Sequence, residues 1–142
     1  MSNVDLLQSV YRAFGSGDIP AILEAISDDV AWEQWDHDNS AQKAGVPWYE
    51  AREGRDGAAA FFESLGVMEI HDFQVLNLME GGNQIAATIR IDFTVKETGE
   101  RVRDEEIHLW TFDDAGKITG MRHYADTAKH IKAVKGSLAG VG

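Results

Sequence analysis

Residues 105–112, Glu-Glu-Ile-His-Leu-Trp-Thr-Phe, place one ionisable ring in a run of strand-forming side chains. Successive side chains of a strand point to opposite faces, so His108, Trp110 and Phe112 share one face. A neutral imidazole can donate one hydrogen bond and accept another. Because its ordinary pKa lies near neutrality, the ring is also suited to proton transfer. The stretch therefore predicts a strand with one face that carries a group capable of acid–base chemistry.

A second histidine follows on the next predicted strand, where Met121 and His123 share a face. Two interpretations are open. If both faces turn inward, the two rings look into one cavity and contact a ligand there. Alternatively, each ring is a core histidine, bonded to a backbone carbonyl or to Glu106. A buried imidazole needs a hydrogen-bond partner, and a pocket supplies one through its ligand.

Other groups with useful chemistry are few. Residues 35–39, Trp-Asp-His-Asp-Asn, place His37 between two aspartates, but adjacent ligands on a loop rarely converge on one ion. The glycine-containing segments 15–18 and 80–83 are turn signals and not phosphate loops. The chain has no cysteine, which excludes disulfides and thiolate chemistry. We expect no metal site and no cofactor.

Apolar spacing divides the chain into a helical part and a strand part. In residues 4–26 and 56–65 apolar residues repeat every three or four positions, whereas in the strands beyond residue 70 they alternate. Asp18 and Pro20 mark the start of the second helix, and Asp56 marks the start of the third. The expected helices are 4–14, 19–26, 56–65 and 126–134, and the expected strands are 30–34, 71–79, 84–97, 101–112 and 118–125.

Residues 35–55 show no period and are expected to form a long loop. Loops of this length are uncommon in compact domains and are often functional. Trp48 and Tyr49 within this segment fit either a mouth over an apolar pocket or ordinary packing of the loop on the body.

Helices followed by a run of strands indicate the α+β class. A length of 142 residues suits a single domain, 1–142, with one core. We expect a cone: a strongly bent, mainly antiparallel sheet that wraps the N-terminal helices on its concave face. A small ligand can enter the open end of such a cone between the sheet and the helices.

The charge balance and hydropathy argue against several partners. The net charge is −11, and residues 1–80 hold 4 Lys/Arg against 15 Asp/Glu. A nucleic-acid groove needs a basic stripe, which this distribution does not offer. No apolar run reaches the length of a membrane span, and the N-terminal residues lack the pattern of a signal peptide. We expect a cytoplasmic protein that binds neither nucleic acid nor membrane.

Three strings carry a resemblance to a known family: VYRAFGSGDIPAILEAISDDVAWE at 10–33, GRDGAAAFFESL at 54–65 and LWTFDDAGKITGMRHYADTA at 109–128. With the order of elements, they resemble the SnoaL-like group of the nuclear transport factor 2-like superfamily. This group includes ketosteroid isomerase relatives and polyketide cyclases. The resemblance covers nearly the whole chain and implies the cone-shaped fold, with the faces of His108 and His123 turned inward. The same scaffold hosts enzymes and non-enzymes.

Residue by residue, the resemblance departs from the ketosteroid isomerases. Their general-base aspartate falls on Gln34, which cannot usefully accept a proton near neutral pH. Their oxyanion tyrosine falls on Val10, and Tyr11 would point about 100° away from that direction. Their protonated acid falls on His108. We therefore do not expect a ketosteroid isomerase.

The resemblance implies a small-molecule-binding domain, for which two functions are open. One is a cofactor-independent isomerase or polyketide-cyclase-type enzyme that transfers a proton on an apolar carbonyl compound. His108 and His123 would be its acid–base groups, and Gln34 would orient the carbonyl. The other is a non-catalytic ligand-binding or dimerisation module. The expected ligand-binding side chains are Trp32, Trp110, Met121, Val10, Phe14, Phe62, Trp48 and Tyr49.

The outer face of the sheet is expected to form a homodimer interface, as it often does in this superfamily. Ile107 and Leu109 lie on the opposite side of their strand from His108 and would form an exposed apolar patch. A patch of this kind indicates a partner. Arg90 and Asp92 on the neighbouring strand are expected on the polar face of that strand.

Overall fold

A six-stranded sheet in the order β2-β1-β6-β5-β4-β3 is the frame of the structure. The computed structural model describes residues 1–136. All neighbouring strands are antiparallel except β1 and β6, which are parallel. The strands are β1 Ile26–Trp32, β2 Arg52–Glu53, β3 Met68–Gly81, β4 Gln84–Val95, β5 Arg101–Phe112 and β6 Ile118–Tyr124. The mainly antiparallel sheet is the one expected.

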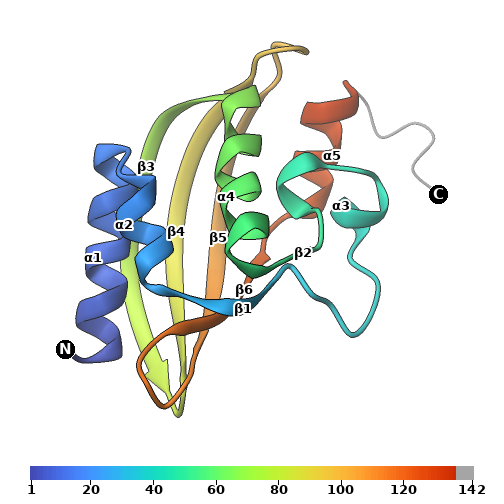
Figure 1. The fold of residues 1–142 in the computed structure, drawn as a ribbon. Coiled ribbons are helices and arrows are strands. Elements are labelled where there is room, and N and C mark those ends of the chain that lie inside the picture. The colour runs from blue at the N-terminus through green and yellow to red at the C-terminus, as the bar shows by residue number, and fades with distance from the viewer. Residues whose placement is uncertain (137–142) are drawn as a thin grey trace.

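Helices α1, α2 and α4 lie along the concave face of the bent sheet, and α3 and α5 lie together toward its other end (Figure 1). The α-helices are α1 Asn3–Ser16, α2 Ile19–Glu24, α3 Ser40–Lys43, α4 Gly54–Ser64 and α5 Thr127–Lys135, and the short 3-10 helices are η1 Pro47–Tyr49 and η2 Leu65–Val67. Among the described residues, no helix is long and apolar enough to cross a membrane. This arrangement confirms the α+β cone.

Local signals set the ends of the first two helices. The Ser2 hydroxyl accepts a hydrogen bond from the Asp5 N–H at 3.1 Å and caps the start of α1. Gly17 ends α1 with φ of 73°, a left-handed conformation that glycine adopts without steric cost. Asp18 then accepts a hydrogen bond from the Ala21 N–H at 3.2 Å and starts α2. The chain therefore reverses within two residues, and both helices pack on the sheet.

The two longest central strands bury opposite kinds of side chain. β4 alternates as expected, and its buried face is apolar: Ile85, Ala87, Ile89, Ile91, Phe93 and Val95. β5 also alternates, but three successive positions of its buried face, Asp104, Glu106 and His108, are ionisable. Buried charges need partners, and the pocket described below supplies them.

The segment between β1 and α4 differs from the expectation. β1 starts at Ile26 and ends at Trp32, earlier than the expected 30–34, and the expected loop contains α3, η1 and β2. α4 begins at Gly54, two residues before Asp56, because Gly54 takes φ of 74° and lets the chain turn from β2 into the helix.

Candidate functional site

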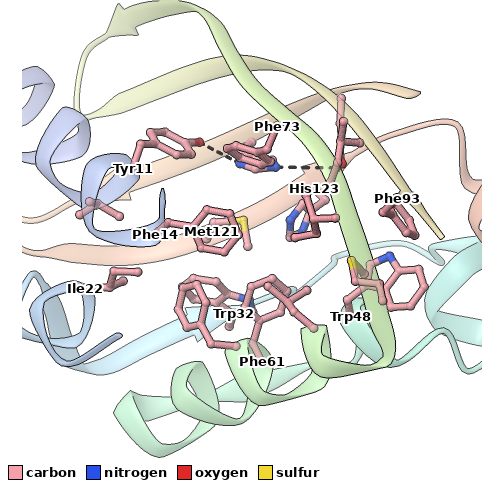
Figure 2. Close-up of a pocket in the computed structure, with 18 of the residues that line it drawn as sticks. Tyr11, Phe14, Ile22, Trp32, Trp48, Phe61, Phe73, Phe93, Met121 and His123 are labelled. Atoms are coloured by element: carbon pink, nitrogen blue, oxygen red, sulfur yellow. Dashed lines mark hydrogen bonds and ion pairs between the residues drawn. The ribbon is translucent and has the colours of Figure 1, made fainter. Parts of the chain in front are cut away.

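An apolar pocket lies between the helical layer and the concave face of the sheet (Figure 2). In this view Tyr11 and Phe14 lie on one side, Trp48 and Phe93 lie on the other, and His123 lies between them. The open volume is about 60 Å³. That volume holds a few water molecules, so aromatic side chains fill most of the cone.

Three half-buried phenylalanines are among the lining residues that solvent reaches. The Phe14 ring lies 5.0 Å from the Phe73 ring and 6.2 Å from the Phe62 ring, centroid to centroid. Deeper in the cone, Trp32 is fully buried against Phe61 at 5.0 Å. Tyr11 and Leu65 are likewise half-buried, and Ile70 is 38% exposed, so solvent reaches the pocket lining at these residues as well.

His108 is held by a hydrogen bond at Nδ1, and its Nε2 lies near a carboxylate without being bonded to it. Its Nδ1 lies 2.8 Å from the Tyr11 hydroxyl, and its Nε2 lies 3.7 Å from Glu106 Oε2. The Trp110 indole N–H donates a hydrogen bond to the same Tyr11 oxygen at 2.9 Å. An indole N–H can only donate, so Tyr11 retains one lone pair and its own proton for His108 or a ligand.

His123 is held by Glu33, the most completely buried carboxylate in the described part of the chain. The Glu33 side chain is hydrogen-bonded to His123 Nδ1 and accepts a further bond from the His123 backbone N–H at 3.1 Å. It also accepts a bond from Trp35 Nε1 at 3.0 Å. Among residues 1–136, His123 Nε2 has no hydrogen-bond partner, and it is the nitrogen left for a ligand.

The two imidazoles are neighbours with opposite protonation tendencies. Their ring centroids are 4.5 Å apart, and His108 pairs directly with His123 across β5 and β6. Burial and the nearby His123 charge hold the pKa of His108 below its ordinary value. Burial alone would also lower the pKa of His123, but the Glu33 carboxylate and, more weakly, Glu106 raise it. Paired groups whose pKa values are pushed apart are typical of acid–base sites.

Burial would raise the pKa of Glu106, but contact with His108 and the charges of the histidines lower it, so Glu106 is ionised. Burial raises the pKa of the Tyr11 hydroxyl, which therefore stays protonated. The polar side of the pocket thus combines a carboxylate, two imidazoles and a neutral phenol.

The prediction that Gln34 faces the pocket is wrong. Gln34 is exposed and donates a hydrogen bond to the Arg52 carbonyl at 2.9 Å. The cause is Glu33, which has φ of 55° and is the only non-glycine residue with positive φ in the described chain. This left-handed step breaks the strand alternation after Trp32, so Trp32 and Glu33 both point inward. A strained conformation of this kind costs about 1–3 kcal/mol and is typical of functional sites.

The expectation that Tyr11 points away from the pocket is also wrong. Both Val10 and Tyr11 line it. They are about 100° apart on the helix, but the buried arc of an amphipathic helix is at least that wide. The phenol that the resemblance placed at Val10 is therefore supplied by Tyr11.

The other expected ligand-binding residues mostly lie where the sequence predicts them. Trp32, Trp110, Met121, Val10, Phe14, Phe62 and Trp48 line the pocket. Tyr49 is fully buried behind it, with its ring 5.7 Å from the His123 ring. Trp48 and Tyr49 are packed inside the body, and the three half-buried phenylalanines are among the lining residues that solvent reaches.

A second buried network, which the sequence pattern did not reveal, closes the inner end of the pocket. Trp48 Nε1 donates to His130 Nδ1 at 3.0 Å, and His130 Nε2 lies 2.9 Å from Asp104 Oδ2. Because Trp48 can only donate, His130 Nδ1 accepts and Nε2 carries the proton. The inward position of Asp104 could have been found from its parity with Glu106 and His108, whereas no sequence signal places His130 beside it.

The bent sheet, the helices in its concavity and the pocket between them define a nuclear transport factor 2-like cone. The sequence matches the SnoaL-like domain family over residues 7–121, and the chain belongs to this family. No curated protein matches the sequence.

Solved structures of similar fold cover nearly the whole chain. One is a nuclear transport factor 2-like protein of unknown function from Burkholderia pseudomallei, with 24% identity, 94% of this chain and 98% of that chain covered, and a TM-score of 0.75. TerC, co-crystallised with polyporic acid, has 23% identity, coverage of 94% and 98%, and a TM-score of 0.70. A Mycobacterium tuberculosis protein in complex with estradiol-17beta-hemisuccinate has 20% identity, coverage of 87% and 94%, and a TM-score of 0.68. At these identities the similarity establishes the fold alone.

Proposed function

We propose that this SnoaL-like domain binds a small, largely apolar carbonyl compound and transfers a proton on it, as an isomerase or a polyketide-cyclase-type enzyme does. The observation that carries the proposal is the pair of imidazoles 4.5 Å apart in one aromatic pocket, each held through Nδ1. Fixing one nitrogen leaves the other in a defined direction. General acid–base catalysis requires that geometry.

His123 is assigned as the acid and His108 as the base. The Glu33 carboxylate stabilises the charged form of His123, which would donate a proton from Nε2 to the carbonyl oxygen. His108 would take a proton from the carbon next to the carbonyl, and Glu106 at 3.7 Å would stabilise the imidazolium that forms. The product of this step is an enol. Return of the proton to another carbon gives isomerisation, and attack of the enol on a second carbonyl gives cyclisation.

Two neutral donors support recognition of the ligand. The Tyr11 hydroxyl already accepts a bond from Trp110, so its own proton is available when His108 Nδ1 acts as the donor. Trp32 Nε1 is buried without a hydrogen-bond partner among residues 1–136. A buried donor left unpaired costs about 1–3 kcal/mol, which a ligand acceptor would recover.

The open volume limits the ligand that fits without rearrangement. A cavity of about 60 Å³ is well below the roughly 300 Å³ or more of typical ligand sites. Binding of a larger ligand therefore requires lining side chains to move, and the half-buried Phe14, Phe62 and Phe73 are candidates. The ligands named for TerC and for the Mycobacterium protein support a small-molecule role for this cone.

Exchange of carbon-bound protons tests the reaction without knowledge of the natural substrate. Cyclic ketones are incubated with the protein in D₂O, with a chelator present, and deuterium incorporation is followed by NMR. We expect acceleration by the wild type and a loss of about 100-fold or more in His123→Phe and His108→Phe, the size of a general acid–base contribution. His37→Ala, on the exposed loop, is the matched control.

The second candidate, a non-catalytic binding module, is favoured by the narrow open volume. It predicts that ketones bind and quench tryptophan fluorescence, and that their carbon-bound protons exchange with D₂O no faster than in buffer. That outcome would overturn the catalytic proposal and retain the binding one.

We also infer a homodimer through the outer face of the sheet. On this face Ile107, Tyr124 and Met79 are 38%, 42% and 47% exposed, and Leu109 is half-buried between them. Ile107 pairs with Tyr124, and Leu109 pairs with Ala86, which pairs with Met79. A contiguous apolar patch of this kind fits a second copy of the chain.

A further inference from the structure

Three donor groups meet on one side of the pocket. A carboxylate oxygen of Glu106 and one ring nitrogen each of His108 and His123 all lie within 4.8 Å of one another, and all three residues are buried. Glu106 and His108 are two positions apart on β5, and His123 pairs with His108 from β6. The sheet therefore fixes the three groups on the same face.

In each histidine Nδ1 already has a partner that orients the ring. Glu33 holds Nδ1 of His123, and the Tyr11 hydroxyl lies 2.8 Å from Nδ1 of His108. Both Nε2 atoms are thereby left for the pocket. Histidines that bind metals are almost always held in this way, because a bond at the other nitrogen fixes the tautomer and raises the basicity of the ligating one.

We propose that Glu106, His108 and His123 form a binding site for a divalent transition-metal ion, with at least one coordination position open to the pocket. Two imidazole nitrogens and one carboxylate oxygen are a donor set of zinc and non-haem iron sites. Bonds of about 2.0–2.1 Å in a tetrahedral site separate ligand atoms by roughly 3.3 Å. His108 Nε2 and Glu106 Oε2, at 3.7 Å, need only a small approach, whereas the wider separations, of up to 4.8 Å, must shorten by about 1.5 Å when the ion binds.

The surrounding charge favours a cation. Three carboxylates are buried around the pocket, because Glu106 lines it and Glu33 and Asp104 are bonded to the lining histidines His123 and His130. A histidine that binds metal is itself neutral. A divalent ion would neutralise the charge of the two nearest carboxylates, Glu106 and Glu33, in a buried site where the effective dielectric constant is low. The ion would also use the Nε2 lone pairs that proton transfer needs, so the metal-bound state would not carry out the proposed reaction.

Metal binding is tested on the whole chain with no organic ligand present. After treatment with a chelator and its removal, Zn²⁺ alone is titrated by calorimetry, with Mg²⁺ and Ca²⁺ in parallel. We expect one Zn²⁺ per chain with a Kd in the micromolar range or below, and no response to Mg²⁺ or Ca²⁺, which prefer all-oxygen sites. Absence of Zn²⁺ binding at millimolar concentration would overturn the proposal.

Substitutions locate the ion. Glu106→Gln keeps the shape of the side chain and should weaken Zn²⁺ binding at least 10-fold, as should His108→Phe. Glu33→Gln should weaken it 10- to 100-fold through the orientation of His123. His37→Ala, which removes an exposed histidine beside two aspartates, should leave the Kd unchanged.

Thermal unfolding with and without Zn²⁺ verifies that each variant is folded. The Kd of a folded Glu106→Gln variant is sufficient to test whether Glu106 is a ligand. An unchanged Kd in that variant, or loss of binding in His37→Ala, would refute this site. Since no carbonyl compound is used, the result is independent of the exchange assay and of the proposed reaction.

Discussion

Replacement of Glu33 tests whether the Glu33–His123 pair holds the polar side of the pocket together. Glu33→Ala removes a fully buried carboxylate that accepts bonds from Trp35 and from two nitrogens of His123. Removal of one partner of a buried ion pair costs about 3–5 kcal/mol, because the other partner stays buried without compensation. Relief of the strained backbone at Glu33 is small for alanine, which also disfavours positive φ. We expect the free energy of unfolding to fall by roughly 4 kcal/mol, a large share of the 5–15 kcal/mol of a typical domain.

Urea unfolding of a double-mutant cycle measures this coupling. With His123→Phe as the second change, the double variant should be less destabilised than the sum of the two single variants, by about 2 kcal/mol. Asp38→Asn is the control, because Asp38 pairs with Lys43 on the surface and such pairs contribute at most about 1 kcal/mol. If the single changes add within about 0.5 kcal/mol, or if Glu33→Ala costs less than about 1 kcal/mol, the pair is not a structural unit and the reasoning fails.

Three further predictions concern other parts of the structure. Ile107→Lys should shift the proposed dimer to monomer in light scattering, and a wild type that is monomeric at micromolar concentration would contradict the interface. His130→Leu removes both the acceptor of the Trp48 N–H and a donor to the buried Asp104 carboxylate. It should destabilise the protein by about 3–5 kcal/mol, with a red shift in tryptophan emission, and unchanged emission would mean that Trp48 stays packed without this bond. Gly54→Ala should cost about 1–2 kcal/mol because φ is 74° and a Cβ would lie 3.3 Å from a backbone oxygen, whereas Gly15→Ala, within α1 and with open space around it, should be neutral or stabilising.

The alternation of apolar residues is sufficient to predict the strands of the sheet and which side chains share a face. β4 and the second half of β5 follow the two-residue period, which puts His108 and Trp110 on one face, and the family resemblance identifies that face as the concave one. The amphipathic stripe likewise places α1, with Val10 and Phe14 in the pocket. These features depend on regular backbone geometry, which sequence periodicity reports directly.

The missed residues lie where the backbone is irregular or where contacts are distant in sequence. Glu33 was missed because a single left-handed residue reversed the strand parity, and no residue type in that stretch signals it. His130 and Trp48 are 82 positions apart and meet only when α5 folds against η1. Tyr11 was misplaced because matching the family's tyrosine to a single position, Val10, cannot show which of two adjacent helix residues reaches the cavity.

The ionisable buried face of β5 has a consequence for how the strand finds its register. Over residues 103–106 the exposed positions, Arg103 and Glu105, are as polar as the buried Asp104 and Glu106. A shift by one residue exchanges the two faces of a strand, and hydrophobicity opposes such a slip only weakly where both faces are polar. Register in this half must come from neighbouring elements: the apolar face of β4, His130 of α5 for Asp104, and His123 of β6 for Glu106. The polar groups of the pocket therefore also distinguish the native strand pairing from its nearest misfolded alternative.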